Sequence, residues 1–218
     1  MRIPYTERFL RWKTEGVGRP LQIDRESVLE AGLAIADRDG LDAVTMQSVA
    51  SGLGVTPMAL YRHVDNKADL LDGLVELLLT DMPLPPKTMA WRERLRWMAD
   101  AVRVTADRHP AVFGLLLQRP AATPGARHVR DGIYQALREG GLSEADIPRV
   151  ERVISTVILG FAASEAGGRF GSRSSHEIDE DFAAAELMID GYLDELARTA
   201  GRSSPPSTSG HVRTGSTA

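Results

Sequence analysis

The stretch VTPMALYRHVDNKADLL, residues 55–71, gathers side chains that could bind a nucleic acid. Arginine and lysine bind phosphate oxygens, an arginine fork can bond the edge of guanine, and apolar side chains can contact the methyl group of thymine. The stretch offers these types in Pro57, Met58, Arg62 and Lys67, with Tyr61 and His63 among them. Binding DNA in this way requires a rigid element that presents the side chains to a groove of the duplex.

The residues around this stretch are typical of two helices joined by a tight turn. Thr45 and Thr56 are expected to cap the two helices, and Pro57 suits the first position of the second one. Gly54 would supply the turn, and Ala50 is small enough to let the helices cross closely. In such a helix–turn–helix unit, the second helix presents its N-terminal side chains to base edges in the major groove.

Helical signals also surround this unit, whereas no strict alternation of apolar and polar residues predicts a strand. An Asp24 cap begins one expected helix, which Gly40 ends, and an Asn66 cap begins another, which the prolines after residue 82 end. Apolar residues three or four apart predict further helices within 89–109, 110–118, 126–141, 147–161 and 182–196. The sequence therefore predicts an all-α fold.

Composition divides the chain into four parts. Residues 1–22 are expected to form a flexible basic arm, which either touches DNA or remains free. Residues 201–218, rich in Ser, Gly, Pro and Thr, are expected to form a disordered tail. Between them we expect a three-helix helix–turn–helix DNA-binding domain over residues 23–68 and a helical ligand-binding and dimerisation domain over residues 69–200.

The bulk composition narrows the class of protein. The net charge of −4 weakens nonspecific attraction to a polyanion, although a local basic arm and helix N-termini can still bind phosphates. The absence of cysteine excludes disulfides and thiolate zinc sites. Because there is neither an apolar run of about 18 residues nor a secretion signal, we expect a cytoplasmic protein without a membrane span.

The segment from Asp24 to Leu78 resembles the DNA-binding domain of the TetR-family (tetracycline-repressor-like) transcriptional regulators. The matching residues are Thr45, Ala50, LGV at 53–55, LYRHV at 60–64 and NKADLL at 66–71. The resemblance implies that Thr45, Tyr61 and Lys67 hold phosphates, with His63 beside them. The residues that it implies on or near the base-reading surface are Gln47, Thr56, Pro57, Met58 and Arg62. Taken singly, Tyr61 could instead be a packing aromatic and Lys67 a solvated lysine.

The segment VILGFAASEAG, residues 157–167, resembles the dimer helix of the tetracycline-repressor type of C-terminal domain. Pairing this helix and the last one with their copies would give a four-helix dimer interface. The residues expected in it are Val157, Ile158, Phe161, Ile189, Tyr192 and Leu193. These stripes could instead close the chain's own core. We favour a two-fold homodimer because paired half-sites multiply the weak affinity of one short recognition helix.

Aromatic residues and methionine between Trp91 and Leu137 predict a pocket for a small apolar or aromatic effector. The candidate lining residues are Trp97, Met98, Val102, His109, Phe113, Leu116, Leu117 and Tyr134. Ordinary core packing is the alternative for each of them. Neither His109 nor His128 has a second ligand at metal-binding spacing, so we expect no metal and no cofactor.

An enzyme is not expected. The chain lacks a cysteine nucleophile, a Gly-x-Ser-x-Gly elbow and a His-Glu-x-x-His helix, and its acidic cluster at 177–181 suits a helix start. The predicted function is a ligand-responsive, DNA-binding transcriptional regulator, and the resemblance implies a repressor that its effector releases from a palindromic operator. The alternative is a helical adaptor or small-molecule binder that has lost DNA binding, which the acidic net charge favours.

Overall fold

The computed structural model describes residues 23–118 and 123–202 of the 218-residue chain. Every regular element in these ranges is helical, so the predicted all-α fold is confirmed. The arm expected over residues 1–22 lies outside the described residues, as does the tail from residue 203 on. None of the described helices is both long and apolar enough to cross a membrane.

The N-terminal helices begin and end where local signals predict. α1 (Arg25–Asp39) is capped by Asp24, whose Oδ1 accepts a hydrogen bond of 2.8 Å from Ser27 N, and it ends at Gly40. A 3-10 turn, η2 (Leu41–Ala43), leads to α2 (Met46–Leu53). Gly54 ends α2 with a φ of 68°, a left-handed conformation that glycine adopts without strain.

The third helix, α3 (Pro57–Leu60), departs from the sequence prediction at its cap. Thr56 occupies the cap position with an extended backbone, but its side chain makes no capping hydrogen bond, so the predicted side-chain cap is wrong. The reason is that Ala59 N already donates to Thr56 O at 2.9 Å, which leaves that amide no need of a hydroxyl.

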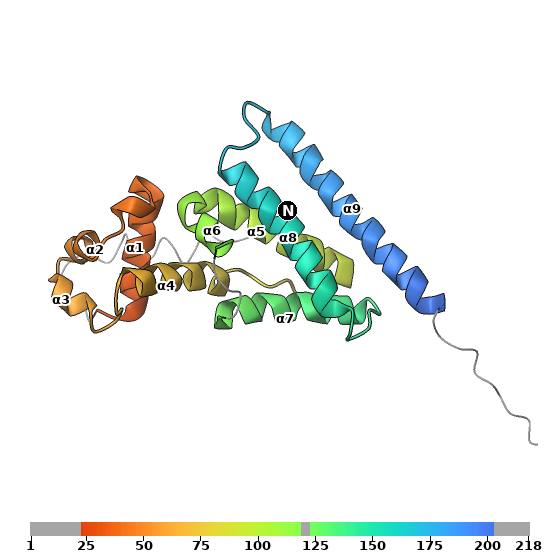
Figure 1. Cartoon of the computed structure of the whole chain (residues 1–218), viewed down its shortest axis with the longest axis horizontal. Helices are drawn as coiled ribbons and strands as arrows, with labels where there is room; N and C mark the ends of the chain where they lie inside the picture. The colour runs from red at the N-terminus through yellow and green to blue at the C-terminus, as the bar shows by residue number, and fades with distance from the viewer. Residues whose placement is uncertain (1–22, 119–122, 203–218) are drawn as a thin grey trace, which may run out of the picture.

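The remaining helices continue from this unit. They are α4 (Lys67–Thr80), α5 (Trp91–Arg108), α6 (Pro110–Leu116), α7 (Pro124–Glu139), α8 (Ile147–Ala166) and α9 (Ser175–Arg202). Figure 1 shows α1–α3 at one end of the molecule, α5–α9 at the other, and α4 running from the first group to the second. α9 lies along the outer edge and extends two residues into the expected tail.

Two hydrophobic cores form, and α4 belongs to the first of them and also packs against α7, which contributes to the second. Leu70, Leu74 and Leu78 of α4 are buried in the N-terminal core with α1, α2 and α3. Val112 of α6 completes this core, while the second core fills the space among α5, α7, α8 and α9. The domain boundary expected between residues 68 and 69 falls at the start of α4, which leaves the helix packed against both units.

Replacing Leu60 should show how strongly α3 depends on its packing. Leu60 is fully buried, so Leu60→Ala should lower the free energy of unfolding by about 2–5 kcal/mol. Met58, two residues earlier in the same helix, is 74% exposed, so Met58→Ala should change it by no more than about 0.5 kcal/mol. Urea unfolding followed by circular dichroism measures both, and equal losses would contradict the buried position of Leu60.

Candidate functional site

α3 is anchored from behind, so that its N-terminal side chains point outward. The turn between α2 and α3 is closed by hydrogen bonds from Gly54 N to Ser51 O at 3.2 Å and from Val55 N to Ala50 O at 3.0 Å. Ala50 and Leu60 are buried between the two helices. This is the geometry in which a recognition helix enters the major groove.

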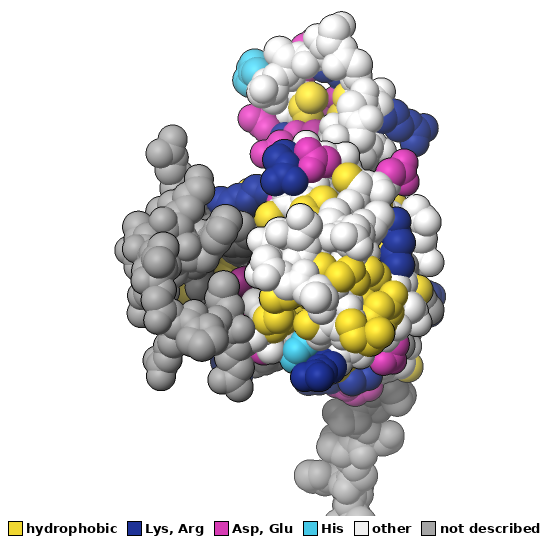
Figure 2. Space-filling view, turned by 90° about the vertical axis from the view of Figure 1, so that its left-hand side faces the viewer, with side chains coloured by type: hydrophobic (Ala, Val, Ile, Leu, Met, Phe, Trp, Pro, Cys, Tyr) yellow, Lys and Arg dark blue, Asp and Glu magenta, His cyan; other side chains and the backbone are white. Residues whose placement is uncertain are grey.

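All nine residues predicted to meet DNA lie between Thr45, which caps α2, and Lys67, the first residue of α4, at the end of the molecule opposite α9 (Figure 1). Met58 is 74% and Tyr61 49% exposed, and Gln47, Arg62 and Lys67 are exposed as well. Pro57 and His63 are partly buried. Figure 2 looks onto this end and shows a hydrophobic patch bordered by basic side chains and a histidine. Apolar and basic groups therefore share one accessible surface.

Thr45 and Thr56 are exposed too, but they differ in what their side chains do. Thr45 Oγ1 accepts a hydrogen bond of 3.0 Å from Ser48 N and forms the capping box of α2. A phosphate that binds Thr45 therefore competes with Ser48 Oγ, which lies 3.0 Å from the same hydroxyl. Thr56 makes no side-chain cap, so its hydroxyl is not used in this way.

An ion pair that the sequence analysis missed holds the base of this surface. Arg25, at the start of α1, donates to both carboxylate oxygens of Asp69 in α4, at 2.7 and 3.1 Å. The same guanidinium donates to the main-chain carbonyl of His63 at 2.6 Å. Asp69 also accepts from Asp65 N at 2.8 Å. One arginine thus ties α1, the end of the recognition segment and the first turn of α4 together.

The ion pair between Arg25 and Asp69 also shifts the pKa of the Asp69 carboxyl. The Arg25 guanidinium, hydrogen-bonded to the Asp69 carboxylate, holds the pKa of that carboxyl below its usual range. The sequence signal was ambiguous, because an acidic residue three positions after Asn66 is typical of a capping box. Asn66 does cap α4, accepting from Asp69 N at 3.0 Å, but the Asp69 carboxylate turns to Asp65 N and Arg25 instead.

The second candidate site is a cavity of about 730 Å³ among α4, α5, α7 and α8. Most of its wall is apolar, as is usual for a small-molecule site. The lining residues are Asp72, Val75, Leu79, Met82, Leu95, Met98, Ala99, Val102, Leu116, Thr123, Ala126, Val129, Arg130, Ile133, Tyr134, Glu151, Arg152, Ile154, Ser155, Thr156, Ile158 and Leu159. Its size suits an organic molecule of drug-like dimensions.

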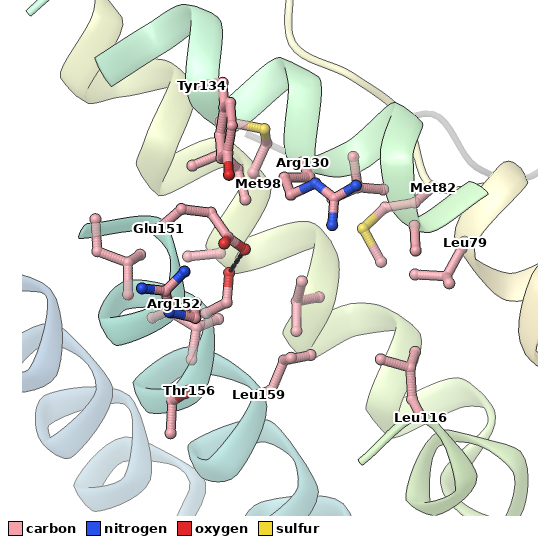
Figure 3. Close-up of a pocket in the computed structure, with 18 of the residues that line it drawn as sticks. Leu79, Met82, Met98, Leu116, Arg130, Tyr134, Glu151, Arg152, Thr156 and Leu159 are labelled. Carbon is pink, nitrogen blue, oxygen red and sulfur yellow. Dashed lines mark hydrogen bonds between the residues drawn. The ribbon is translucent and has the colours of Figure 1, made fainter. Parts of the chain in front are cut away.

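The cavity wall carries both polar and apolar side chains. In Figure 3, Tyr134, Glu151 and Arg152 lie on the side formed by α7 and α8. Ser155 Oγ donates to Glu151 Oε1 at 2.8 Å. The opposite side, toward α4 and α6, carries Leu79, Met82 and Leu116. Arg130 of α7 lies next to Met82 in Figure 3, and Asp72 of α4 also lines the cavity, so polar groups stand beside the apolar wall on this side too.

Of the residues predicted for the pocket, Met98, Val102, Leu116 and Tyr134 line the cavity. The other four are elsewhere. Phe113 is buried in the second core, Leu117 is 52% exposed, and Trp97 is half-buried outside the cavity wall. His109 Nδ1 lies 2.9 Å from Asp37 Oδ2 of α1, so it links the two units instead of facing the cavity.

The cavity also uses residues to which the sequence analysis gave no role. The first half of α8 supplies Glu151, Arg152, Ser155 and Thr156, and α7 supplies Arg130. Periodicity along α8 shows its apolar stripe, but a polar residue facing a cavity looks the same in sequence as one facing solvent. Only the crossing of α8 over α5 reveals which of its polar residues face inward.

The residues predicted for a dimer interface divide in the same way. Ile158, Ile189 and Leu193 are buried in the chain's own second core. Val157, Phe161 and Tyr192 are half-buried against that core. The apolar side chains that α8 and α9 expose are Val153, Leu187 and Met188. Most of the predicted interface residues therefore pack within the chain itself, and the exposed apolar residues lie next to them on α8 and α9.

Within the described ranges, no group of three or more His, Cys, Asp or Glu side chains could hold a metal ion. The described acids Glu177, Asp179, Glu180 and Asp181 lie in the first turns of α9, as expected for a helix start.

The exposed recognition helix defines this chain as a helix–turn–helix protein. Residues 28–74 match the model of the "Bacterial regulatory proteins, tetR family", and residues 82–199 match the "Tetracyclin repressor-like, C-terminal domain". The chain belongs to the tetR family of bacterial regulatory proteins, which confirms the resemblance found in the sequence.

Individual relatives agree with this assignment. The chain is 30% identical over 181 residues to the HTH-type transcriptional repressor DrrR1 of Streptomyces coeruleorubidus, covering 82% of this chain and 66% of that protein. A crystal structure of BioQ with its double-stranded DNA operator is 26% identical with a TM-score of 0.66, covering 79% and 98% of the two chains. The ActR protein of Streptomyces coelicolor in complex with (S)-DNPA shares the fold, with 22% identity, a TM-score of 0.69 and coverages of 80% and 98%.

The chain spans only part of the length of some relatives. Its alignments with three curated relatives cover 66%, 63% and 57% of their own lengths.

Removing the Arg25–Asp69 ion pair should cause a pH-dependent loss of stability. Because the pKa of Asp69 is lowered in the folded state, its carboxylate stabilises the fold above about pH 4, and this contribution is lost as the pH falls through the folded-state pKa. Asp69→Asn should therefore lower the free energy of unfolding by about 1 kcal/mol at neutral pH, as for a partly exposed pair. The difference from wild type should shrink below about pH 4.

Denaturant unfolding at a series of pH values measures this difference. Asp39→Asn, which removes an exposed ion pair with Arg38 in the last turn of α1, is the control and should have little effect. A difference between Asp69→Asn and wild type that stays constant down to about pH 3 would contradict the role of the Asp69 carboxylate.

Proposed function

We propose that this chain is a DNA-binding transcriptional regulator that represses from a palindromic operator as a homodimer and is released by a small amphipathic effector. The observation that carries the proposal is the outward-facing α3, with Met58 and Tyr61 exposed at its ends and Arg62 and Lys67 beside them. Family membership, the DrrR1 repressor and the BioQ–operator structure support it. It would act in the cytoplasm, beside chromosomal DNA.

The DNA contacts divide into two kinds. Lys67 at the first position of α4, together with Tyr61, Thr45 and His63, would bind phosphates and set the register of the protein on the duplex. Arg62, Gln47, Thr56, Pro57 and Met58 would read bases. The two apolar residues at the start of α3 carry no hydrogen-bonding group, so thymine methyl contacts and DNA shape would contribute to specificity.

Dimerisation would bring two such surfaces to successive major grooves. α8 and α9 expose Val153, Leu187 and Met188, and Leu187 is 73% exposed. Burying these side chains against a second copy removes apolar surface from water, and a two-fold pairing places the same patch on both partners. The operator half-sites would then lie about one helical turn, or a small multiple, apart.

The effector would enter the cavity with its polar group toward Tyr134 and Glu151 and its apolar body toward Leu79, Met82 and Leu116. This orientation places the apolar body against α4, the helix that also packs against α1. An effector releases DNA only if it binds more tightly to the helix spacing that does not fit the operator. The family is one of regulatory proteins, so we propose no catalytic activity.

Selection of bound duplexes from a random DNA pool tests the proposal directly. The expected result is an inverted repeat whose half-site spacing matches the two-fold dimer. Failure to bind any duplex at low ionic strength would overturn DNA binding and leave the adaptor or small-molecule-binder alternative.

Two substitutions separate phosphate binding from base reading. Lys67→Ala should weaken binding to every duplex and make the logarithmic salt dependence shallower by about one unit, because one phosphate contact is lost. Arg62→Ala should cost about 1–3 kcal/mol at the preferred base and relax specificity there. Fluorescence anisotropy against the selected operator and its single-base variants measures both. An equal loss across all variants for Arg62→Ala would contradict base reading.

Filling the cavity should block the binding of small molecules. Leu159→Trp adds bulk to the cavity wall, so it should weaken binding of the amphipathic dye 1-anilinonaphthalene-8-sulfonate about tenfold, which corresponds to about 1.4 kcal/mol. Leu117→Trp is the control, because Leu117 is exposed and outside the wall. Dye fluorescence measures the affinity, and equal effects of the two variants would show that the dye binds elsewhere.

A further inference from the structure

On the side of the DNA-binding unit, α4 has no spare room. A Cβ added at Gly73 of α4 would lie 2.4 Å from Leu29 Cδ2 of α1, and one added at Gly32 of α1 would lie 3.3 Å from Leu74 Cδ2 of α4. Both glycines are buried. Packed interiors do not deform continuously, so α1 and α4 must move together.

On the side of the cavity, the N-terminus of α7 meets α4 just as closely. Gly125, the second residue of α7, donates its main-chain N–H to Glu76 Oε1 of α4 at 2.6 Å. A Cβ on Gly125 would lie 2.9 Å from Leu79 Cβ and 3.1 Å from Thr80 Oγ1. Figure 1 shows the start of α7 against the second half of α4.

The Glu76 carboxylate depends on this contact. Its Oε1 accepts the Gly125 amide, while its buried Oε2 has no hydrogen-bond partner within the described part of the chain. The carboxylate also lies at the positive end of the α7 dipole, which favours a negative charge there. A displacement too small to admit water would leave a desolvated carboxylate without its donor, whereas a larger one would expose it to water, so the contact is either made or broken.

The cavity wall flanks this contact on both helices. Ala126 follows Gly125 and Thr123 lies two residues before it, and both line the cavity. On α4, Val75 precedes Glu76 and Leu79 lies one turn after it, and both line the same cavity. A molecule in the cavity therefore touches each helix immediately beside the hydrogen bond that joins them.

We infer that the Glu76–Gly125 contact transmits a change in the cavity to the DNA-binding surface, with Glu76 as a positioning residue. We call this contact the joint. Displacement of the α7 N-terminus breaks or strains the contact, and α4 carries the change to α1 through Gly73 and to His63 through Asp69 and Arg25. The inference rests on the proposed function, and it adds the residues that couple the two sites.

Hydrogen–deuterium exchange of the full chain, free and bound to the selected operator duplex, tests the joint without knowledge of the effector. Coupling between sites is reciprocal, so DNA bound at α3 must also act on the α7 N-terminus. In wild type, duplex binding should slow exchange in the peptide spanning residues 123–130 by about fivefold or more, the lower end of typical coupling between sites.

Three variants assign this protection to Glu76. Glu76→Leu removes the acceptor and should abolish the slowing, whereas Glu76→Gln keeps an acceptor oxygen and should restore most of it. Glu177→Leu is the matched control, because Glu177 also accepts a helix N-terminal amide, from Ser174 N at 2.8 Å, but in α9. It should behave as wild type. If Glu76→Leu does not fold, Gly125→Ala keeps the amide but forces α7 away from α4, and it should lose the slowing.

The possible outcomes test the joint and the proposed function separately. Binding of the duplex without any change in exchange at residues 123–130, or an unchanged response in Glu76→Leu, overturns the joint and leaves the proposed function intact. A chain that binds no duplex at all overturns the proposed function, and the joint falls with it.

Discussion

The proposed DNA-binding surface depends on a helix that is too short to be stable by itself. α3 has four residues, and isolated helices of that length do not form in water because nucleation is unfavourable. Its direction comes from what lies behind it: Leu60 and Ala50 in the core, and Arg25, which joins the His63 carbonyl to Asp69. The surface around α3 is therefore positioned by apolar packing and by the contacts of one arginine, Arg25. Every functional proposal for this surface requires both.

Local chemistry made the helix boundaries predictable. Asp24, Thr45 and Asn66 each accept a hydrogen bond from an amide three residues ahead, so the information lies within one turn of sequence. The same holds for Gly54, whose left-handed backbone excludes most other residues at that position. The residues proposed to contact DNA came from the same short stretch, because they all belong to one local unit. Thr56 failed as a side-chain cap because a main-chain bond already served the amide.

Features that join distant segments were not predictable from patterns. Arg25 and Asp69 lie 44 residues apart, and nothing in the spacing of either reveals the other. The cavity wall raised the same difficulty: Phe113 and Met98 are both apolar residues buried in the second core, yet only Met98 also lines the cavity. α8 serves the cavity, the core and an exposed face at once, whereas periodicity separates only apolar from polar sides. Which apolar side chain faces a void depends on how helices cross.

The sharing of α4 between two units has a thermodynamic consequence. Leu70 and Leu74 belong to the N-terminal core, while Val75 and Leu79 belong to that core and also face the cavity. If α4 unfolded, water would enter the interiors of both units, so the two units should unfold together. A calorimeter should then record one endotherm for the whole chain. A guest that fills the cavity then raises the melting temperature of the recognition helix as well, even though it touches no residue of that helix.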